Sequence, residues 1–134
     1  MSSMIFVNLP VADVARSRVF YQALSFSINE AFSNADGACV VISPQIYVMI
    51  LQRDFFKSFT ALPVGELGVT VSSLFALSCE SRGDVDAMMS AALAAGGGEP
   101  VPARDLGFIY NRSFTDIDGH MFEPFWMDSA AANS

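Results

Sequence analysis

The sequence predicts an α+β fold in which two βαβββ modules form a curved mixed sheet around a cleft. A short apolar strand followed by a capped amphipathic helix occurs twice, 71 residues apart. Each helix precedes a β-rich run that is divided by turn residues. The length of 134 residues suits one compact domain. We therefore expect a single domain over residues 1–134, with module one at about 4–53, a connector at about 54–68 and module two at about 69–128.

Module one begins with an apolar strand over residues 4–9. Asp13 follows and suits the N-cap of a helix, because its carboxylate can accept hydrogen bonds from the first free backbone N–H groups. Turn residues at 34–37 (NADG) and 43–45 (SPQ) then divide the β-rich run. The predicted strands lie near residues 26–32, 38–42 and 45–52.

The connector carries a Phe-rich segment, residues 55–59, that predicts a short helix or turn. We interpret it as a lid, a dimer seam or ordinary packing. Pro63 and Gly65 follow and favour an irregular path inside one domain.

Module two repeats the plan with a strand over residues 70–79 and a helix that Asp84 can cap. Gly96 suits the end of that helix, and residues 96–98 (GGG) are read as a helix terminator because a phosphate loop would precede a helix. Turn residues at 104–107 and 116–119 divide the rest. The predicted strands lie near residues 99–103, 108–115 and 120–127.

The charge and composition exclude several classes of partner. A formal net charge of −7 repels nucleic acid and anionic membrane surfaces. The chain has no apolar run long enough to span a membrane and no basic segment typical of a signal peptide at its start. Cys39 and Cys79 lack CxxC spacing and predict reduced thiols and a cytoplasmic protein. The 52% apolar content favours a homodimer.

One carboxylate, Glu123, stands within the apolar stretch FTDIDGHMFEPFWMD. Strand alternation places Met121, Glu123, Phe125 and Met127 on one face and His120, Phe122, Pro124 and Trp126 on the other. Both faces are apolar, so we expect Glu123 to be partly dehydrated and to need a partner.

Two interpretations of Glu123 stay open. The preceding strand is joined by a four-residue turn and should bring Tyr110 and Arg112 close, so that Arg112 pairs with Glu123, or Tyr110 or Asn8 donates a weaker hydrogen bond. Alternatively, Glu123 faces the cleft and binds a metal or a cationic or hydroxyl group of a ligand, or acts as a general base. Arg112 could then meet an anionic substrate.

Two motifs resemble the vicinal oxygen chelate superfamily, which includes glyoxalase I, bleomycin-resistance proteins and extradiol dioxygenases. One is DVARSRVFY, which begins at Asp13, and the other is DIDGHMFE, which ends at Glu123. The resemblance extends over residues 4–128 and implies the glyoxalase/bleomycin-resistance/dioxygenase-like fold. In metal-dependent members, it also implies four converging ligands, of which Glu123 is one.

The other implied ligand positions are apolar in this chain. They fall on Phe6, on Met49 or Leu51, and on Leu74, which offer no metal donor. Asn8 and Gln52 are the nearest oxygen donors, and His120 alternates away from Glu123. We therefore expect no cofactor, with a divalent metal at Glu123 as the alternative.

Three functions remain in competition. The first is a glyoxalase/bleomycin-resistance-like protein that binds a small, partly apolar molecule in the inter-module cleft, with the usual metal site degenerate. Glu123 is the candidate catalytic residue. The second is a metal-dependent lyase, isomerase or dioxygenase of the lactoylglutathione lyase type using Glu123. The third is a non-catalytic acidic dimeric interaction module whose cleft is filled with side chains, since a stripe of Met and aromatic residues is also typical of a core. The candidate ligand-binding residues are Phe6, Asn8, Tyr47, Met49, Leu51, Leu74, Tyr110 and Arg112.

Overall fold

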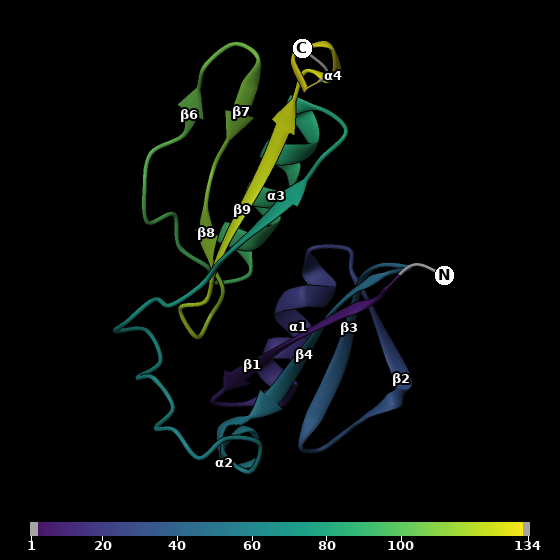
Figure 1. The fold of residues 1–134 in the computed structure, drawn as a ribbon, viewed down its shortest axis with the longest axis vertical. Helices are drawn as coiled ribbons and strands as arrows, with labels where there is room; N and C mark the ends of the chain where they lie inside the picture. Colours follow the sequence, from purple (N-terminus) through teal and green to yellow (C-terminus); the bar gives the residue numbers. More distant parts are fainter. Residues whose placement is uncertain (1–2, 133–134) are drawn as a thin grey trace. The chain divides into compact units, whose positions relative to one another are not determined.

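The computed structural model describes residues 3–132 and divides into two compact units, Met1–Thr70 and Val71–Ser134. Each unit contains one sheet with a helix packed against it (Figure 1). The predicted α+β class with two βαβββ modules is confirmed.

The first unit has a four-stranded sheet in the order β1-β4-β3-β2, in which β1 is parallel to β4 and the other neighbours are antiparallel. Helix α1 packs on one face, above the buried side chains of Val40, Val48 and Ile50. The elements are β1 (Ile5–Val11), α1 (Val14–Ala23), β2 (Ser27–Asn34), β3 (Gly37–Ser43), β4 (Ile46–Gln52) and the short α2 (Arg53–Lys57).

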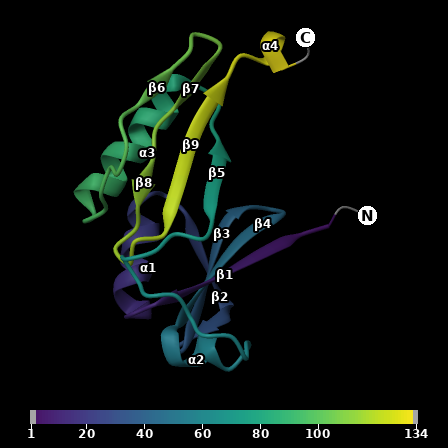
Figure 2. The same ribbon diagram turned by 60° about the vertical axis from the view of Figure 1, so that its left-hand side comes forward.

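The second unit repeats this topology. Strand β5 is parallel to β9, and β7 and β6 follow in antiparallel order, while β8 continues the line of β7 along β9 (Figure 2). Helix α3 buries Val85, Met89 and Ala92 against the sheet. The elements are β5 (Leu74–Ser78), α3 (Arg82–Ala94), β6 (Arg104–Asp105), β7 (Ile109–Asn111), β8 (Phe114–Thr115), β9 (Met121–Met127) and α4 (Ser129–Ala132).

The two helices begin differently. Asp13 is the N-cap of α1 as predicted, and its carboxylate accepts hydrogen bonds from the backbone N–H of Ala15 at 3.0 Å and of Arg16 at 3.3 Å. The prediction of Asp84 as the N-cap of α3 is wrong. Ser81 holds that position and accepts a hydrogen bond from the backbone N–H of Asp84 at 3.1 Å, which places Asp84 in the first turn. A carboxylate in the first turn still interacts favourably with the positive end of the helix dipole.

Both helices end on a left-handed residue at equivalent positions of the repeat, Ser25 with φ 71° and Gly96 with φ 103°. The role of Gly96 as a helix terminator is therefore confirmed.

The predicted strand at residues 99–103 is wrong, because that segment runs past the sheet edge and only residues 104 and 105 pair with β7. Pro100 and Pro102 lack the N–H groups that a strand ladder requires. The predicted strand 108–115 is divided into β7 and β8. No helix within residues 3–132 is long and apolar enough to cross a membrane.

Candidate functional site

Five of the predicted ligand-binding residues lie on one face of the first unit's sheet. Phe6 pairs with Tyr47 and Asn8 pairs with Met49, while Leu51 follows on the same face of β4. This face is opposite the one that packs against α1, whose buried residues occupy the alternate positions. Leu51 is buried, whereas Phe6 and Asn8 are exposed.

Phe6 and Tyr47 form a stacked pair, which we name the aromatic platform. Their ring centroids lie 4.6 Å apart with an interplanar angle of 9°. The Tyr47 hydroxyl donates a hydrogen bond to the Pro44 carbonyl at 2.7 Å, which fixes its ring. The Asn8 amide donates to the Phe6 carbonyl at 3.1 Å. The platform is thus an ordered aromatic surface at the edge strand β1.

Glu123 lies on the face of the second sheet that is opposite α3. Its register partner on β5 is Ala76, and Leu74 pairs with Met121 beside it. We name the residues Leu74, Ala76, Met121, Glu123 and Phe125 the open face. Leu74 and Ala76 are exposed and the three β9 residues are half-buried, so an apolar surface accessible to solvent surrounds the carboxylate.

The Glu123 side chain has no hydrogen bond or ion pair with any residue in the described range 3–132. Ser113 lies directly opposite Glu123 on the segment that runs antiparallel to β9. The pairs of Asn111 with Phe125 and of Phe114 with Phe122 belong to one continuous register, and this register places residue 113 opposite residue 123. The Ser113 side chain is 2% exposed, and its hydroxyl also has no hydrogen-bond partner among the described residues. We did not predict Ser113 from the sequence.

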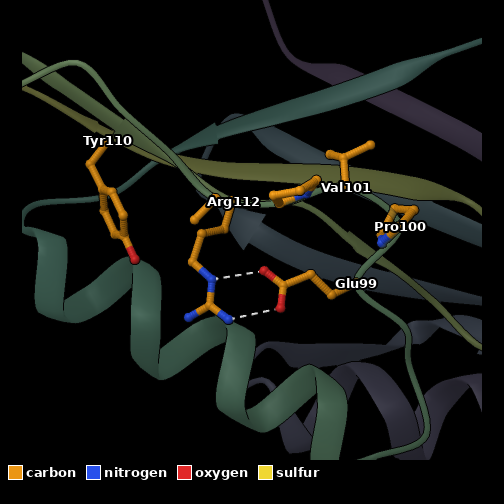
Figure 3. A pocket seen from close by; sticks show the side chains of 7 residues that line it. Glu99, Pro100, Val101, Tyr110 and Arg112 are labelled. Carbon is orange, nitrogen blue, oxygen red and sulfur yellow. Dashed lines mark hydrogen bonds and ion pairs between the residues drawn. The ribbon is translucent and has the colours of Figure 1, made fainter.

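Tyr110 and Arg112 lie on the opposite face of this sheet, toward α3 (Figure 3). The Tyr110 hydroxyl donates to Asp86 of α3 at 2.6 Å. Arg112 donates to both carboxylate oxygens of Glu99 at 3.0 Å and to Asp86 at 2.9 Å. The predicted Arg112–Glu123 pair is therefore wrong, and so is the predicted closeness of Tyr110 to Glu123.

The reason is a turn that is one residue shorter than predicted. A four-residue turn at 116–119 would place Arg112 opposite Glu123. Instead Asp116 donates its backbone N–H to the His120 carbonyl at 2.9 Å, so only three residues form the loop. Gly119 adopts φ 94°, as such loops require. A shift of one residue moves every side chain to the other face, which places Ser113 opposite Glu123.

The Arg112 ion pairs alter the ionisation of their partners. The hydrogen bond from Tyr110, followed by that from Arg112, lowers the pKa of Asp86. The hydrogen bond from Arg112 also lowers the pKa of Glu99. Both carboxylates are therefore ionised at neutral pH.

Glu99, Tyr110 and Arg112 line one side of an open depression of about 560 Å³ on the α3 face. Residues 100–103 line its other side (Figure 3). The guanidinium points at Glu99 and away from β9. Three of its N–H groups are already used, so the network holds the segment after Gly98 against α3.

The residues around Glu123 do not fit a metal ion. Across residues 3–132, no three His, Cys, Asp or Glu side chains are grouped so that they could hold one. Gln52, a predicted oxygen donor, is engaged elsewhere: its side-chain oxygen accepts from the Val14 backbone N–H at 2.6 Å, and its amide donates to the Ala12 carbonyl at 3.3 Å. One carboxylate and apolar neighbours form a poor donor set for a divalent cation.

Residues 4–43 match a family model described as bleomycin resistance protein-like N-terminal. No curated protein matches the chain.

Solved structures share the fold over nearly the whole chain. A hypothetical protein from S. aureus is 24% identical, with a TM-score of 0.79 over 94% of this chain and 95% of that one. A glyoxalase-related enzyme from Fulvimarina pelagi is 18% identical, with a TM-score of 0.78 over 94% and 88% of the two chains. A glyoxalase/bleomycin resistance protein/dioxygenase family enzyme from Burkholderia phytofirmans PsJN is 14% identical, with a TM-score of 0.77 over 94% and 99%.

The match in module one and the shared fold agree with the resemblance that the two sequence motifs predicted. The chain has the fold of the glyoxalase/bleomycin-resistance/dioxygenase proteins, and its residues 4–43 are similar to the bleomycin resistance protein-like family.

Proposed function

We propose that the chain binds a small, partly apolar molecule at the open face, and that Glu123 accepts a hydrogen bond from a cationic or hydroxyl group of that molecule. One observation carries the proposal. A half-buried carboxylate stands among apolar side chains without a hydrogen bond or ion pair from residues 3–132. A charged group in such surroundings is stabilised by a partner, and a ligand can supply it.

The surrounding chemistry supports the class of ligand. Leu74, Met121 and Phe125 offer apolar contact on both sides of the carboxylate. The net charge of −7 favours a cation over an anion. The aromatic platform of the first unit is an additional candidate surface for an apolar or aromatic group. The prediction that both faces border one cleft remains a prediction.

The test uses three probes that share a benzyl or phenyl ring and differ in their polar group: benzylamine, benzyl alcohol and benzoate. Isothermal titration should give the tightest binding for benzylamine and the weakest for benzoate. Glu123→Gln should remove the preference for the amine because it removes the charge. Glu80→Gln is the matched control, because it changes the net charge equally at an exposed acid beyond the open face. Equal affinity for all three probes would overturn the proposal.

We also propose that the usual metal site of the superfamily is degenerate here and that no metal is needed for binding. Titration with nickel, zinc, manganese and ferrous ions should show no stoichiometric binding. Stoichiometric metal that is lost in Glu123→Ala would instead support the metal-dependent lyase, isomerase or dioxygenase. If no probe shifts the melting temperature, the filled interaction module is favoured, since a ligand of the folded state raises that temperature.

We further propose that the protein acts in the cytoplasm as a homodimer. Free Cys39 and Cys79 support a reducing compartment. Large exposed apolar side chains, such as Phe59 and Leu62 of the connector, support self-association. Sedimentation at several concentrations measures the oligomeric state.

A further inference from the structure

Ser113 carries a buried hydroxyl that no hydrogen bond within the described residues satisfies. Its side chain is 2% exposed, and its oxygen has no hydrogen-bond partner in the described part of the chain. Buried hydroxyl groups are normally paired, because leaving one unpaired is destabilising. An alanine would fill the same position on the strand without that cost. The serine therefore needs an explanation beyond packing.

The register places this hydroxyl directly across from Glu123. Arg112 donates its backbone N–H to the Pro124 carbonyl at 3.2 Å, which makes these two residues a hydrogen-bonded pair of the antiparallel ladder. Ser113 and Glu123, one step along, then form the non-hydrogen-bonded pair, in which side chains are closest and Cα atoms lie about 4.5 Å apart. A hydroxyl with an unused donor thus lies beside a carboxylate with unused acceptors.

The surroundings of Glu123 are asymmetric. On the β5 side its neighbour is the small, exposed Ala76, which leaves the carboxylate open to solvent. On the β7–β8 side its neighbour is the buried Ser113. In the absence of ligand, water on the open side can satisfy the carboxylate. A ligand that arrives over Ala76 displaces that water, and the carboxylate then needs another donor.

We propose that Ser113 is the positioning residue of this site: its hydroxyl donates a hydrogen bond to one oxygen of Glu123 when a ligand dehydrates the carboxylate, so that the other oxygen faces the ligand's donor. This inference rests on the proposed function and deepens it. The ligand class is an apolar body with an ammonium or hydroxyl donor that approaches over Ala76. Binding satisfies two groups at once, the carboxylate and the buried hydroxyl.

The experiment compares benzylamine binding and melting temperature for the full chain and three variants. Ser113→Ala should weaken benzylamine binding about tenfold, because a hydrogen bond to a charged group is lost only in the bound state. Without ligand, its melting temperature should not fall below that of the wild type and should rise by up to about 2–5 °C, because an unpaired buried hydroxyl is removed. Ser113→Thr keeps the hydroxyl and should retain the affinity.

Ser78→Ala is the matched control. Ser78 lies on the same sheet face beside Phe125 but is exposed, so its replacement should leave both readouts unchanged. Benzylamine affinity of Ser113→Ala within twofold of wild type would overturn the positioning role while leaving the proposed function intact. So would a lower melting temperature of the ligand-free Ser113→Ala variant, which indicates a structural hydroxyl. If Ser113→Thr does not fold, the alanine variant alone decides. Failure of the wild type to bind benzylamine would overturn the proposed function itself.

Discussion

The two faces of the second unit's sheet differ in whether their charged side chains have partners. On the α3 face, Arg112 is paired with Asp86 and Glu99, and Arg82 is paired with Asp105. Arg82 also lies over the rings of Tyr110 and Trp126, at 5.2 and 5.0 Å. On the open face, Glu123 has no ion pair with any residue from 3 to 132. Strand β9 therefore has one face beside paired charges and one face with an unpaired carboxylate. A ligand can contribute most at the second face, by supplying the partner of that carboxylate.

The largest expected contrast lies within β9, between Phe122 on the α3 face and Phe125 on the open face. Phe122 is 1% exposed and stacks on Phe114 with ring centroids 5.2 Å apart, whereas Phe125 is half-buried. Phe122→Ala should lower the free energy of unfolding by about 3–5 kcal/mol, because it leaves a cavity. Phe125→Ala should cost about 1 kcal/mol, because less surface is buried. Urea unfolding measures both, and equal losses would erase the distinction between the faces.

A smaller contrast separates Arg112 from Glu123 as charged residues. Arg112→Met keeps the apolar stem but leaves Glu99 and Asp86 without their cation, and should cost about 1–2 kcal/mol of unfolding free energy after allowance for solvent exposure. Glu123→Gln removes a charge that has no partner on the described chain, so its cost should stay within about 0.5 kcal/mol. A larger loss for Glu123→Gln in urea unfolding would show that Glu123 has a structural role.

The smallest effect is a pH dependence of stability that arises from the Arg112 ion pairs on the α3 face. The hydrogen bond from Arg112 lowers the pKa of Glu99 below its ordinary value of 4.5. The hydrogen bonds from Tyr110 and Arg112 lower the pKa of Asp86 below its ordinary value of 3.8. Carboxylates with a lowered folded pKa contribute stability above those ordinary values, and the contribution is lost as pH falls through the folded pKa. Between about pH 5 and pH 3, the wild type should therefore lose more stability than Arg112→Met. Parallel stability curves for the two proteins would contradict the assignment.

Much of this architecture could be predicted because it follows from local patterns. The repeat of strand, capped helix and β-rich run gave both modules, and Asp13 and Gly96 act at the helix ends as expected. The first sheet's candidate residues share one face because alternation along β1 and β4 fixes the face of each side chain. Periodicity alone was sufficient there.

The partners of Arg112 and Glu123 could not be obtained in the same way, because they depend on how many residues close the loop before β9. Asp116 accepts hydrogen bonds on its carboxylate from the backbone N–H of Asp118 and of His120, each at 2.9 Å, and this local bonding favours the three-residue loop. The sequence DIDG is compatible with either length. Ser113 was missed for the same reason, and so was the pairing of Arg112 with Asp86, whose α3 side chain is distant in sequence.

The parallel pairing of β5 with β9 also has a kinetic consequence. β9 is the central strand of its sheet, in contact with β5, β7 and β8, and it follows all of them in the chain. During synthesis this sheet therefore cannot close until β9 has left the ribosome, and β5 must wait unpaired while some forty residues are added.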